Sequence, residues 1–535
     1  MDEILHKDNN SQNSNNISSF LKNFYAIIIE FGEIVYPLIL FYYCLFSYGS
    51  INLFFISRTY KDPDMINAIG ISNLYVNITT GVIINGITGA LETLASNAYG
   101  AKNYKLMGIY FDRCRYIAIS FWLIMAFVHF FFARTILGFL KVEERVIDLA
   151  LEYIVISVIS LLVNINFFIN QKHLVLIEKP KINFYISFFS LIIQIITGYL
   201  LVVVFKYGVR GSALSYFFSS LFNAVSSTLI LKRMDLEEGS LVFFTKEGLK
   251  DWKNYLNIAI PGVLICGGEW IGYELQSIFA IYISPVDYST QIIVVNLELI
   301  AFPYTGAINS AISMKSGDKL MTMEPEKLKN YFLMSYLFSF CCSVIVLFLV
   351  IFFGNFYFEI MAPNEEIYLN CVRVKLMVCW YIFAENVYYF FLGCLKGYGY
   401  LRNTTIATIV MFFVISPILI YILAFRCKFG VKGLWASTSF SMTLGDVLFI
   451  YWVFSFDLIK IKELANKRIK ADNKNIVDDK KEVKEIFLME NDNSELNINN
   501  KDKDNKNEIK GENHIGKKEY NNNNNNIEMN YINNN

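Results

Sequence analysis

The sequence predicts an all-α polytopic membrane protein, with twelve transmembrane helices in two six-helix bundles related by an internal repeat. Composition is the first reason: 55% of the 535 residues are hydrophobic, including 47 Phe and 34 Tyr, which is more apolar surface than a soluble chain can bury. Secondly, apolar runs close to or above the roughly 20 residues that cross a bilayer recur along the chain, with most of the charge between them. A third reason is a short motif that occurs once in each half.

The apolar runs divide the chain into domains. They lie near 33–56, 68–93, 116–139, 147–170, 183–205, 211–231, 255–284, 290–313, 331–354, 370–395, 403–425 and 433–455. We therefore expect a cytoplasmic polar segment at 1–32, an N-lobe at 33–235, an inter-lobe loop at 236–254, a C-lobe at 255–456 and a tail at 457–535. Because this tail is rich in Asn, Lys, Asp and Glu, we expect it to be disordered and passive.

The repeated motif is "YGVRG" at 207–211, which returns as "FGVKG" at 429–433. Each copy stands just before the last apolar run of its half, where the glycines suit a tight turn between helices. The equivalent place of the two copies favours duplication, a construction common among two-lobed transporters.

Lys and Arg concentrate in the segments after even-numbered runs, near 102–115, 172–181, 232–253, 315–329 and 396–402. By the positive-inside rule both termini should face the cytoplasm. The first residues are polar and lack the apolar core of a signal peptide. The cysteines form no C-x-x-C pair and the four histidines are isolated, so we predict no metal site and no cofactor.

Two carboxylates interrupt the seventh run, in "ICGGEWIGYE" at 265–274. Glu269 and Glu274 lie about 140° apart on a straight helix, and no Lys or Arg occurs from 254 to 284. A charge at the bilayer centre costs at least about 3 kcal/mol, so such acids are functional candidates. Pro261 and the pair Gly267–Gly268 make bending plausible, and a bend would let both acids border one cavity.

Three further acids stand in or at the ends of apolar runs: Glu298, Glu385 and Glu92. A buried carboxyl group without a partner keeps its proton until a cation or water reaches it. That behaviour suits exchange of protons for a cationic solute. Nearby aromatic side chains, which include Trp270, Tyr273 and Tyr388, offer cation–π contacts to an organic cation.

At these residues the sequence resembles the eukaryotic branch of the multidrug and toxic compound extrusion (MATE) family. "NITTGVIINGITGALETLASNAYGAKNY" (77–104) resembles its second-helix signature, and "AIPGVLICGGEWIGYELQSIFA" (259–280) its seventh-helix pattern. "FAENVYYFFLGCLKGYGYLRN" (383–403) is similar to the tenth helix, and the two repeated motifs match glycine turns before helices six and twelve. The resemblance spans about 33–456.

The resemblance implies a V-shaped antiporter that exports organic cations, drugs or small metabolites in exchange for H⁺ rather than Na⁺. It places the essential acids at Glu269, Glu274 and Glu385, with Glu298 as a further candidate. Animal members often carry Glu where Asn296 falls. Bacterial members have an acid in the first helix, where Asn52 falls here. The substrate cavity would include Trp270, Tyr273, Asn296, Tyr388, Asn77 and Glu92.

The expected partners are a small molecule, the coupling proton and the bilayer, with no nucleic acid. We expect a monomer in the plasma membrane or in a vacuolar or other organellar membrane. One alternative is a flippase for a lipid-linked precursor from the same wider superfamily, although such proteins line their cavity with Arg and Lys. A channel or receptor is another alternative. An enzyme is not expected, because no nucleophile–base pair or metal-ligand spacing stands out.

Overall fold

The computed structural model describes residues 2–60, 62–139, 143–362 and 364–474. These residues are helical almost throughout, and no strand occurs among them. The chain divides into a large unit that ends at Asp472 and a second unit, Asn473–Asn535, of which residues 473 and 474 are described. The large unit contains both lobes.

The N-lobe is built from the first six spans. Its elements are α1 (Asp2–Tyr60), α2 (Pro63–Val76), the π-helical turn Asn77–Gly81, α3 (Val82–Gly89), α4 (Leu91–Gly100), α5 (Tyr104–Phe139), α6 (Glu144–Leu176), α7 (Pro180–Gly198), the π-helical turn Tyr199–Val204 and α8 (Gly208–Arg233). The second span is one broken rod of α2, α3 and α4. A loop with the single 3₁₀ turn Glu247–Leu249 leads to the C-lobe.

The C-lobe repeats this plan. Its elements are α9 (Trp252–Ile283), α10 (Pro285–Thr322), α11 (Pro325–Met361), α12 (Glu365–Tyr398), α13 (Leu401–Val410), the π-helical turn Met411–Ile415, α14 (Ser416–Ile420), the π-helical turn Tyr421–Arg426 and α15 (Gly430–Ser455). Eleven helical segments of the described chain are long and apolar enough to cross a membrane by themselves, and α15 with the following bent helix makes twelve.

The outer surface of these helices is apolar, as expected for a surface that faces lipid. Large apolar side chains that would be buried in a soluble protein stand exposed along several spans: Leu123, Phe131, Phe139, Ile345, Phe352 and Tyr451. A surface of this kind is stable only against hydrocarbon. The protein is therefore a multi-pass integral membrane protein, as the apolar runs predict.

The internal repeat is visible in the backbone of the two motif turns. Lys206 and Gly208 have φ of 55° and 56°, and their counterparts Lys428 and Gly430 have φ of 59° and 57°. In both copies the turn follows a π-helical segment and opens the last helix of its lobe. Because a positive φ is costly for most residues but not for glycine, the glycines of the repeated motif serve the same turn twice.

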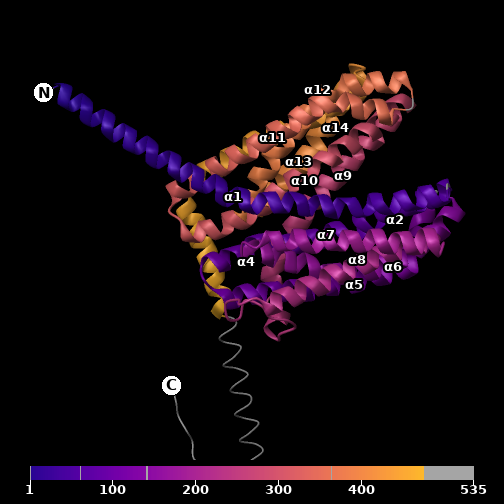
Figure 1. Ribbon diagram of the computed structural model, residues 1–535, viewed down its shortest axis with the longest axis horizontal. Coiled ribbons are helices and arrows are strands. Elements are labelled where there is room, and N and C mark those ends of the chain that lie inside the picture. The colour runs from indigo at the N-terminus through magenta and orange to yellow at the C-terminus, as the bar shows by residue number, and fades with distance from the viewer. Residues whose placement is uncertain (1, 61, 140–142, 363, 475–535) are drawn as a thin grey trace, which may run out of the picture. The chain divides into compact units, whose positions relative to one another are not determined.

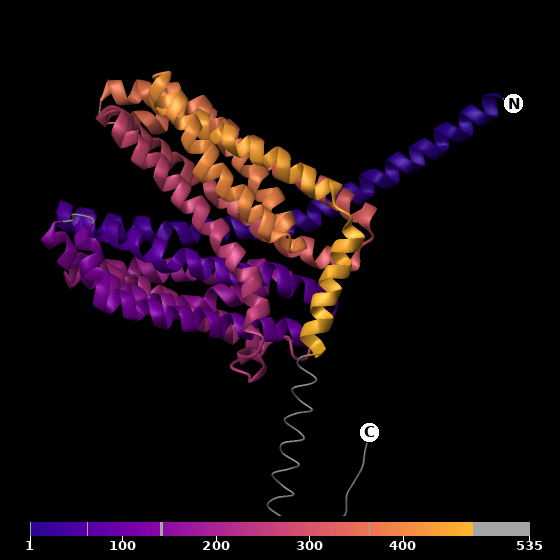
Figure 2. The same ribbon diagram turned by 180° about the vertical axis from the view of Figure 1, so that it is seen from behind.

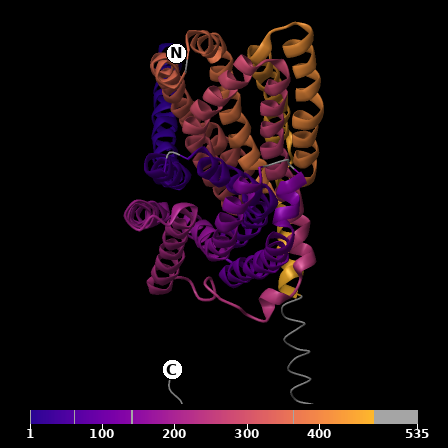
Figure 3. The same ribbon diagram turned by 90° about the vertical axis from the view of Figure 1, so that its right-hand side faces the viewer.

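The two lobes meet at one end of their helices and separate toward the other (Figures 1 and 2). Figure 3 shows them from that other end as two distinct groups of helices. Contacts between the lobes run through α3 with α9, α4 with α10 and α1 with α10. A Cβ at Gly86 would collide with the backbone of Val263, and one at Gly317 with the side chain of Ser96, so glycine allows the helices to touch. We call this region the closed end.

The structure corrects where the C-terminal tail starts. Residues Leu458–Lys474 form a helix bent by 83° from α15, instead of belonging to a disordered tail from 457. Arg468 of this helix lies against Gly399 of the C-lobe. Asp472, only 4% exposed, accepts a hydrogen bond of 2.7 Å from Tyr110 and pairs with Arg113 at 3.5 Å. The helix therefore spans both lobes at the closed end, and residues 475–535 lie outside the described chain.

Two truncations should separate the helix from the tail. Deleting 475–535 is expected to leave transport and thermal stability near normal, because the composition of that segment gives it little capacity to pack. Deleting 458–535 also removes Asp472 from Tyr110 and from the buried Arg113, and loss of the hydrogen bond to this charged group should cost roughly 2 kcal/mol of unfolding free energy. Thermal unfolding of both purified variants measures the difference, and equal stability would contradict a packing role for this helix.

Candidate functional site

A pocket opens within the C-lobe, between α9, α10 and α12. Its lining combines three acids with aromatic and apolar side chains: Glu269, Trp270, Tyr273, Glu298, Leu299, Phe302, Tyr381, Glu385, Tyr389, Phe412 and Met442. None of these lining residues, taken from the described chain, is basic. The pocket therefore offers carboxyl groups and ring faces, the two features that bind an organic cation.

Glu269 is held by tyrosines. Tyr388 donates a hydrogen bond of 2.8 Å to one carboxyl oxygen, and Tyr389 donates one of 3.3 Å to the other. Tyr388 is itself fixed by a 3.0 Å contact with the Thr408 hydroxyl. Among the described residues Glu269 has no Lys or Arg within ion-pair distance, so its charge is stabilised by dipoles and remains available to a mobile cation.

Glu298 and Glu385 form a second acidic group in the same pocket. Their carboxyl groups lie close enough to share a hydrogen bond, and Tyr273 donates to Glu298. Oε2 of Glu385 is buried and receives no hydrogen bond from any donor in the described chain. Two carboxyl groups can hydrogen-bond only if one of them carries a proton. The pair is therefore built to hold one proton between two acids.

The rotation of α10 about its axis determines which of two candidate residues on that helix, Asn296 or Glu298, reaches the pocket. Asn296 and Glu298 differ by two residues, or about 200° around a helix. Asn296 is exposed, and its amide donates to the Ile292 carbonyl at 2.8 Å. Glu298 is 2% exposed and lines the pocket. The structure thus brings Glu298 to Glu385 and leaves Asn296 on the opposite face.

Glu274 is not among the pocket lining. It is half-buried on α9, and no hydrogen bond or ion pair is recorded for it in the described chain. The angle of about 140° between Glu269 and Glu274 accounts for this separation, because α9 is helical throughout despite Pro261. Its role in the site stays a prediction from the family resemblance.

A larger cavity lies mainly in the N-lobe. Amide and hydroxyl side chains give it its polar character: Asn52, Asn73, Asn77, Asn85, Thr88, Tyr153, Ser157, Gln171 and Tyr216. Lys172 lines it as well, whereas no Asp or Glu of the described chain does. Trp270 lines both this cavity and the C-lobe pocket, so the two spaces adjoin at its side chain.

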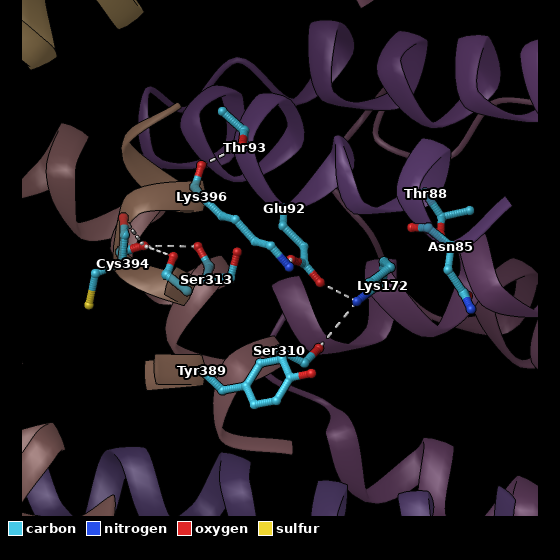
Figure 4. A network of polar contacts seen from close by, with 12 residues as sticks. Asn85, Thr88, Glu92, Thr93, Lys172, Ser310, Ser313, Tyr389, Cys394 and Lys396 are labelled. Carbon is cyan, nitrogen blue, oxygen red and sulfur yellow. Dashed lines mark hydrogen bonds and ion pairs between the residues drawn. The ribbon is translucent and has the colours of Figure 1, made fainter. Parts of the chain in front are cut away.

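Glu92 does not stand free in a cavity but joins the lobes at the closed end (Figure 4). Lys172 of α6 donates to one of its oxygens, and Lys396 of α12 lies 3.9 Å from the other. Lys172 also reaches the Ser310 hydroxyl of α10 at 3.4 Å, and Thr93 donates to the Lys396 carbonyl. Two lysines therefore share one acid across the interface, a network that the sequence analysis missed.

More ion pairs surround this network. Lys315 of α10 pairs with Glu178 and, at 3.1 Å, with Glu30 of α1. Lys319 also meets Glu30, at 3.0 Å. Arg113 lies 3.4 Å from Asp251 just before α9. The interface at the closed end is thus charged and hydrogen-bonded.

Comparison with known proteins identifies the family to which the chain belongs. The family model MatE matches residues 37–200 and 261–422, which is most of both lobes. The chain belongs to the MATE family. It is therefore a transporter of the multidrug and toxin extrusion type.

Individual MATE relatives agree with this. Protein DETOXIFICATION 9 of Arabidopsis thaliana is 23% identical over 404 residues, covering 72% of this chain and 80% of the relative. Multidrug and toxin extrusion protein 1 of Homo sapiens is 23% identical over 407 residues, covering 75% and 70%. The crystal structure of the eukaryotic MATE transporter AtDTX14 superposes with a TM-score of 0.75 at 16% identity, covering 83% of this chain and 99% of that chain.

A further similar structure, an outward-facing MATE transporter of the MOP superfamily, gives a TM-score of 0.73 at 13% identity over 82% of this chain and 97% of that chain. At such identities the superpositions establish the shared fold. The expected two-bundle architecture is thereby confirmed.

Proposed function

We propose that this MATE transporter exports organic cations, drugs or small metabolites in exchange for protons, and that the C-lobe pocket is the exchange site. The observation that carries the proposal is a pocket with three acids and several aromatic rings and with no basic residue in its described lining. Such a pocket holds either protons or a cation, but both together would leave excess positive charge in a region of low dielectric. Competition of this kind couples the two fluxes.

In this mechanism the two acidic groups have different roles. Glu269, which lines the C-lobe pocket next to Trp270, contacts the cationic centre of the substrate, while the ring of Trp270 adds a cation–π contact. The Glu298–Glu385 pair holds a proton and releases it when positive charge enters the pocket. Tyr388, Tyr389 and Tyr273 act as positioning residues, since their hydroxyl groups fix the carboxyl groups they touch.

Alternating access supplies the transport step. The lobes converge toward one end, on the side where both described ends of the chain lie (Figures 1 and 2). Placing the termini in the cytoplasm makes this an outward-open form, with the ion pairs of Glu92, Lys315 and Arg113 closing the cytoplasmic side. We propose that these pairs separate when the lobes rock, and that a single chain in the plasma membrane or an organellar membrane is the transport unit.

The coupling ion should be H⁺ rather than Na⁺. Na⁺ needs several oxygen ligands that converge at close range, whereas the three acids of the pocket, Glu269, Glu298 and Glu385, lie on three different helices among aromatic and apolar side chains. In proteoliposomes, uptake of tetramethylrhodamine methyl ester, an aromatic cation, should follow an imposed pH gradient. A Na⁺ gradient with pH clamped should drive none. Uptake driven by Na⁺ and indifferent to the pH gradient would overturn the assignment.

A further inference from the structure

Lys172, which lines the N-lobe cavity, belongs to an ion-pair network with more positive than negative charge. Lys172 and Lys396 together have two ammonium groups, and Glu92 is the one acid within ion-pair distance of either in the described chain. The remaining acid within electrostatic range of Lys396 is Glu269. When Glu269 is protonated or paired with a substrate cation, one positive charge of this network has no counter-charge. A buried charge without a partner favours binding of an anion.

The geometry of Lys172 leaves room for such a ligand. An ammonium group has three N–H donors, and the contacts of Lys172 in the described chain occupy two of them, with Glu92 and Ser310. The side chain lines the cavity and is 13% exposed. Beside it Gln171 is 3% exposed, and its amide Nε2 has no partner in the described chain. A third lysine N–H and an unused amide N–H are together suited to a carboxylate.

The opposite chemistry of the two spaces completes the argument. The C-lobe pocket is acidic and aromatic, whereas the described lining of the N-lobe cavity has amides, hydroxyls and Lys172 but no acid. Trp270 borders both. One molecule that passes this ring can therefore place a cationic group beside Glu269 and an anionic group beside Lys172.

We propose that Lys172, with the Gln171 amide, forms a carboxylate subsite, and that the preferred substrates are aromatic zwitterions. This inference rests on the proposed function of the C-lobe pocket for the cationic part of the substrate. It makes Lys172 a specificity-determining residue as well as a member of the interlobe network.

A matched pair of fluorescent probes tests the subsite. Tetramethylrhodamine carries a free carboxylate, and its methyl ester is the same aromatic cation without one. Binding of both to the purified full-length protein is measured by fluorescence anisotropy at neutral pH. Lys172→Gln should weaken binding of the acid by about tenfold or more, the usual effect of losing a hydrogen bond to a charged group, and should change binding of the ester less than threefold.

A gentler variant keeps the test valid if Lys172→Gln does not fold. Asn85 lines the same cavity with an exposed side chain, so Asn85→Asp adds one negative charge to the wall without removing a buried contact. This variant should weaken binding of the acid relative to the ester, and the uncharged control Asn85→Ala should leave the ratio unchanged.

The outcomes separate the two proposals. Equal weakening of both probes, unchanged binding of the acid in both charge variants, or failure of the wild type to bind the acid would overturn the carboxylate subsite. The proposed function is tested by a different experiment, uptake into vesicles, because binding in detergent needs no ion gradient. Selective binding of the acid without proton-driven uptake of the ester in vesicles would keep the subsite and reject proton coupling.

Discussion

Glu269→Gln is expected to abolish proton-driven export of organic cations while the protein still folds and reaches the membrane. Glutamine keeps the shape of the side chain. Its carbonyl oxygen still accepts a hydrogen bond from one of Tyr388 and Tyr389, and its amide nitrogen can donate to the hydroxyl oxygen of the other. It can neither release a proton nor balance the charge of a cation. Uptake into proteoliposomes under an imposed pH gradient should fall to the level of empty vesicles.

A surface acid provides the control for this change. Glu326 is exposed in the first turn of α11, so Glu326→Gln removes one carboxylate by the same chemistry at a distance from the pocket. This control should transport at the wild-type rate. Wild-type uptake by Glu269→Gln itself would show that the exchange site lies elsewhere.

The second large effect is expected at the closed end. Glu92→Gln leaves Lys172 and Lys396, which are 13% and 12% exposed, facing each other without the acid between them. Removing one partner of a buried ion pair typically costs about 3–5 kcal/mol, because a buried charge is left uncompensated. The midpoint of thermal unfolding in detergent should therefore fall markedly.

A double variant separates this charge effect from a simple loss of packing. Adding Lys172→Gln to Glu92→Gln removes one of the two stranded ammonium groups, so stability should partly return even though another native residue is gone. If the double variant is instead less stable than Glu92→Gln alone, the network is not held by charge balance.

Much of the fold follows from the sequence because a bilayer imposes a simple rule on each span. Every apolar run overlaps a helix of the structure, and the repeated motif correctly indicates two turns with the same backbone conformation. The ends of helices are less predictable. Both α6 and α12 continue through polar residues, to Leu176 and Tyr398. In these last turns the helices are stabilised by contacts and ion pairs with neighbouring helices instead of by lipid.

The same effect explains which parts of the site sequence reasoning found. The acids of the C-lobe were identifiable because a carboxylate inside an apolar run is conspicuous. Lys172 and Lys396 lie just beyond such runs and looked like loop charges, yet they face Glu92 at the interface of the lobes. Pairing between segments so distant in the chain depends on tertiary packing, which periodicity and composition do not encode.

The remaining site residues were hard to predict because the sequence does not show which face of a helix points to the pocket. The acid in the seventh run that reaches the pocket is Glu269, and Glu274, five residues later, falls on another face. On α10 the spacing of Asn296 and Glu298 has the same consequence. Such differences are set by which face a helix turns toward its neighbours, and a single sequence gives only weak information about that rotation when both faces are apolar.

Proton release upon substrate binding is the most direct test of the account. The purified protein is held in a lightly buffered solution with a pH indicator, and tetramethylrhodamine methyl ester is added until its site is filled. Competition in the C-lobe pocket predicts release of protons in proportion to the bound cation, and no release from Glu269→Gln. Binding of the cation to the wild type without any proton release would contradict the central claim that cation and proton compete for these acids.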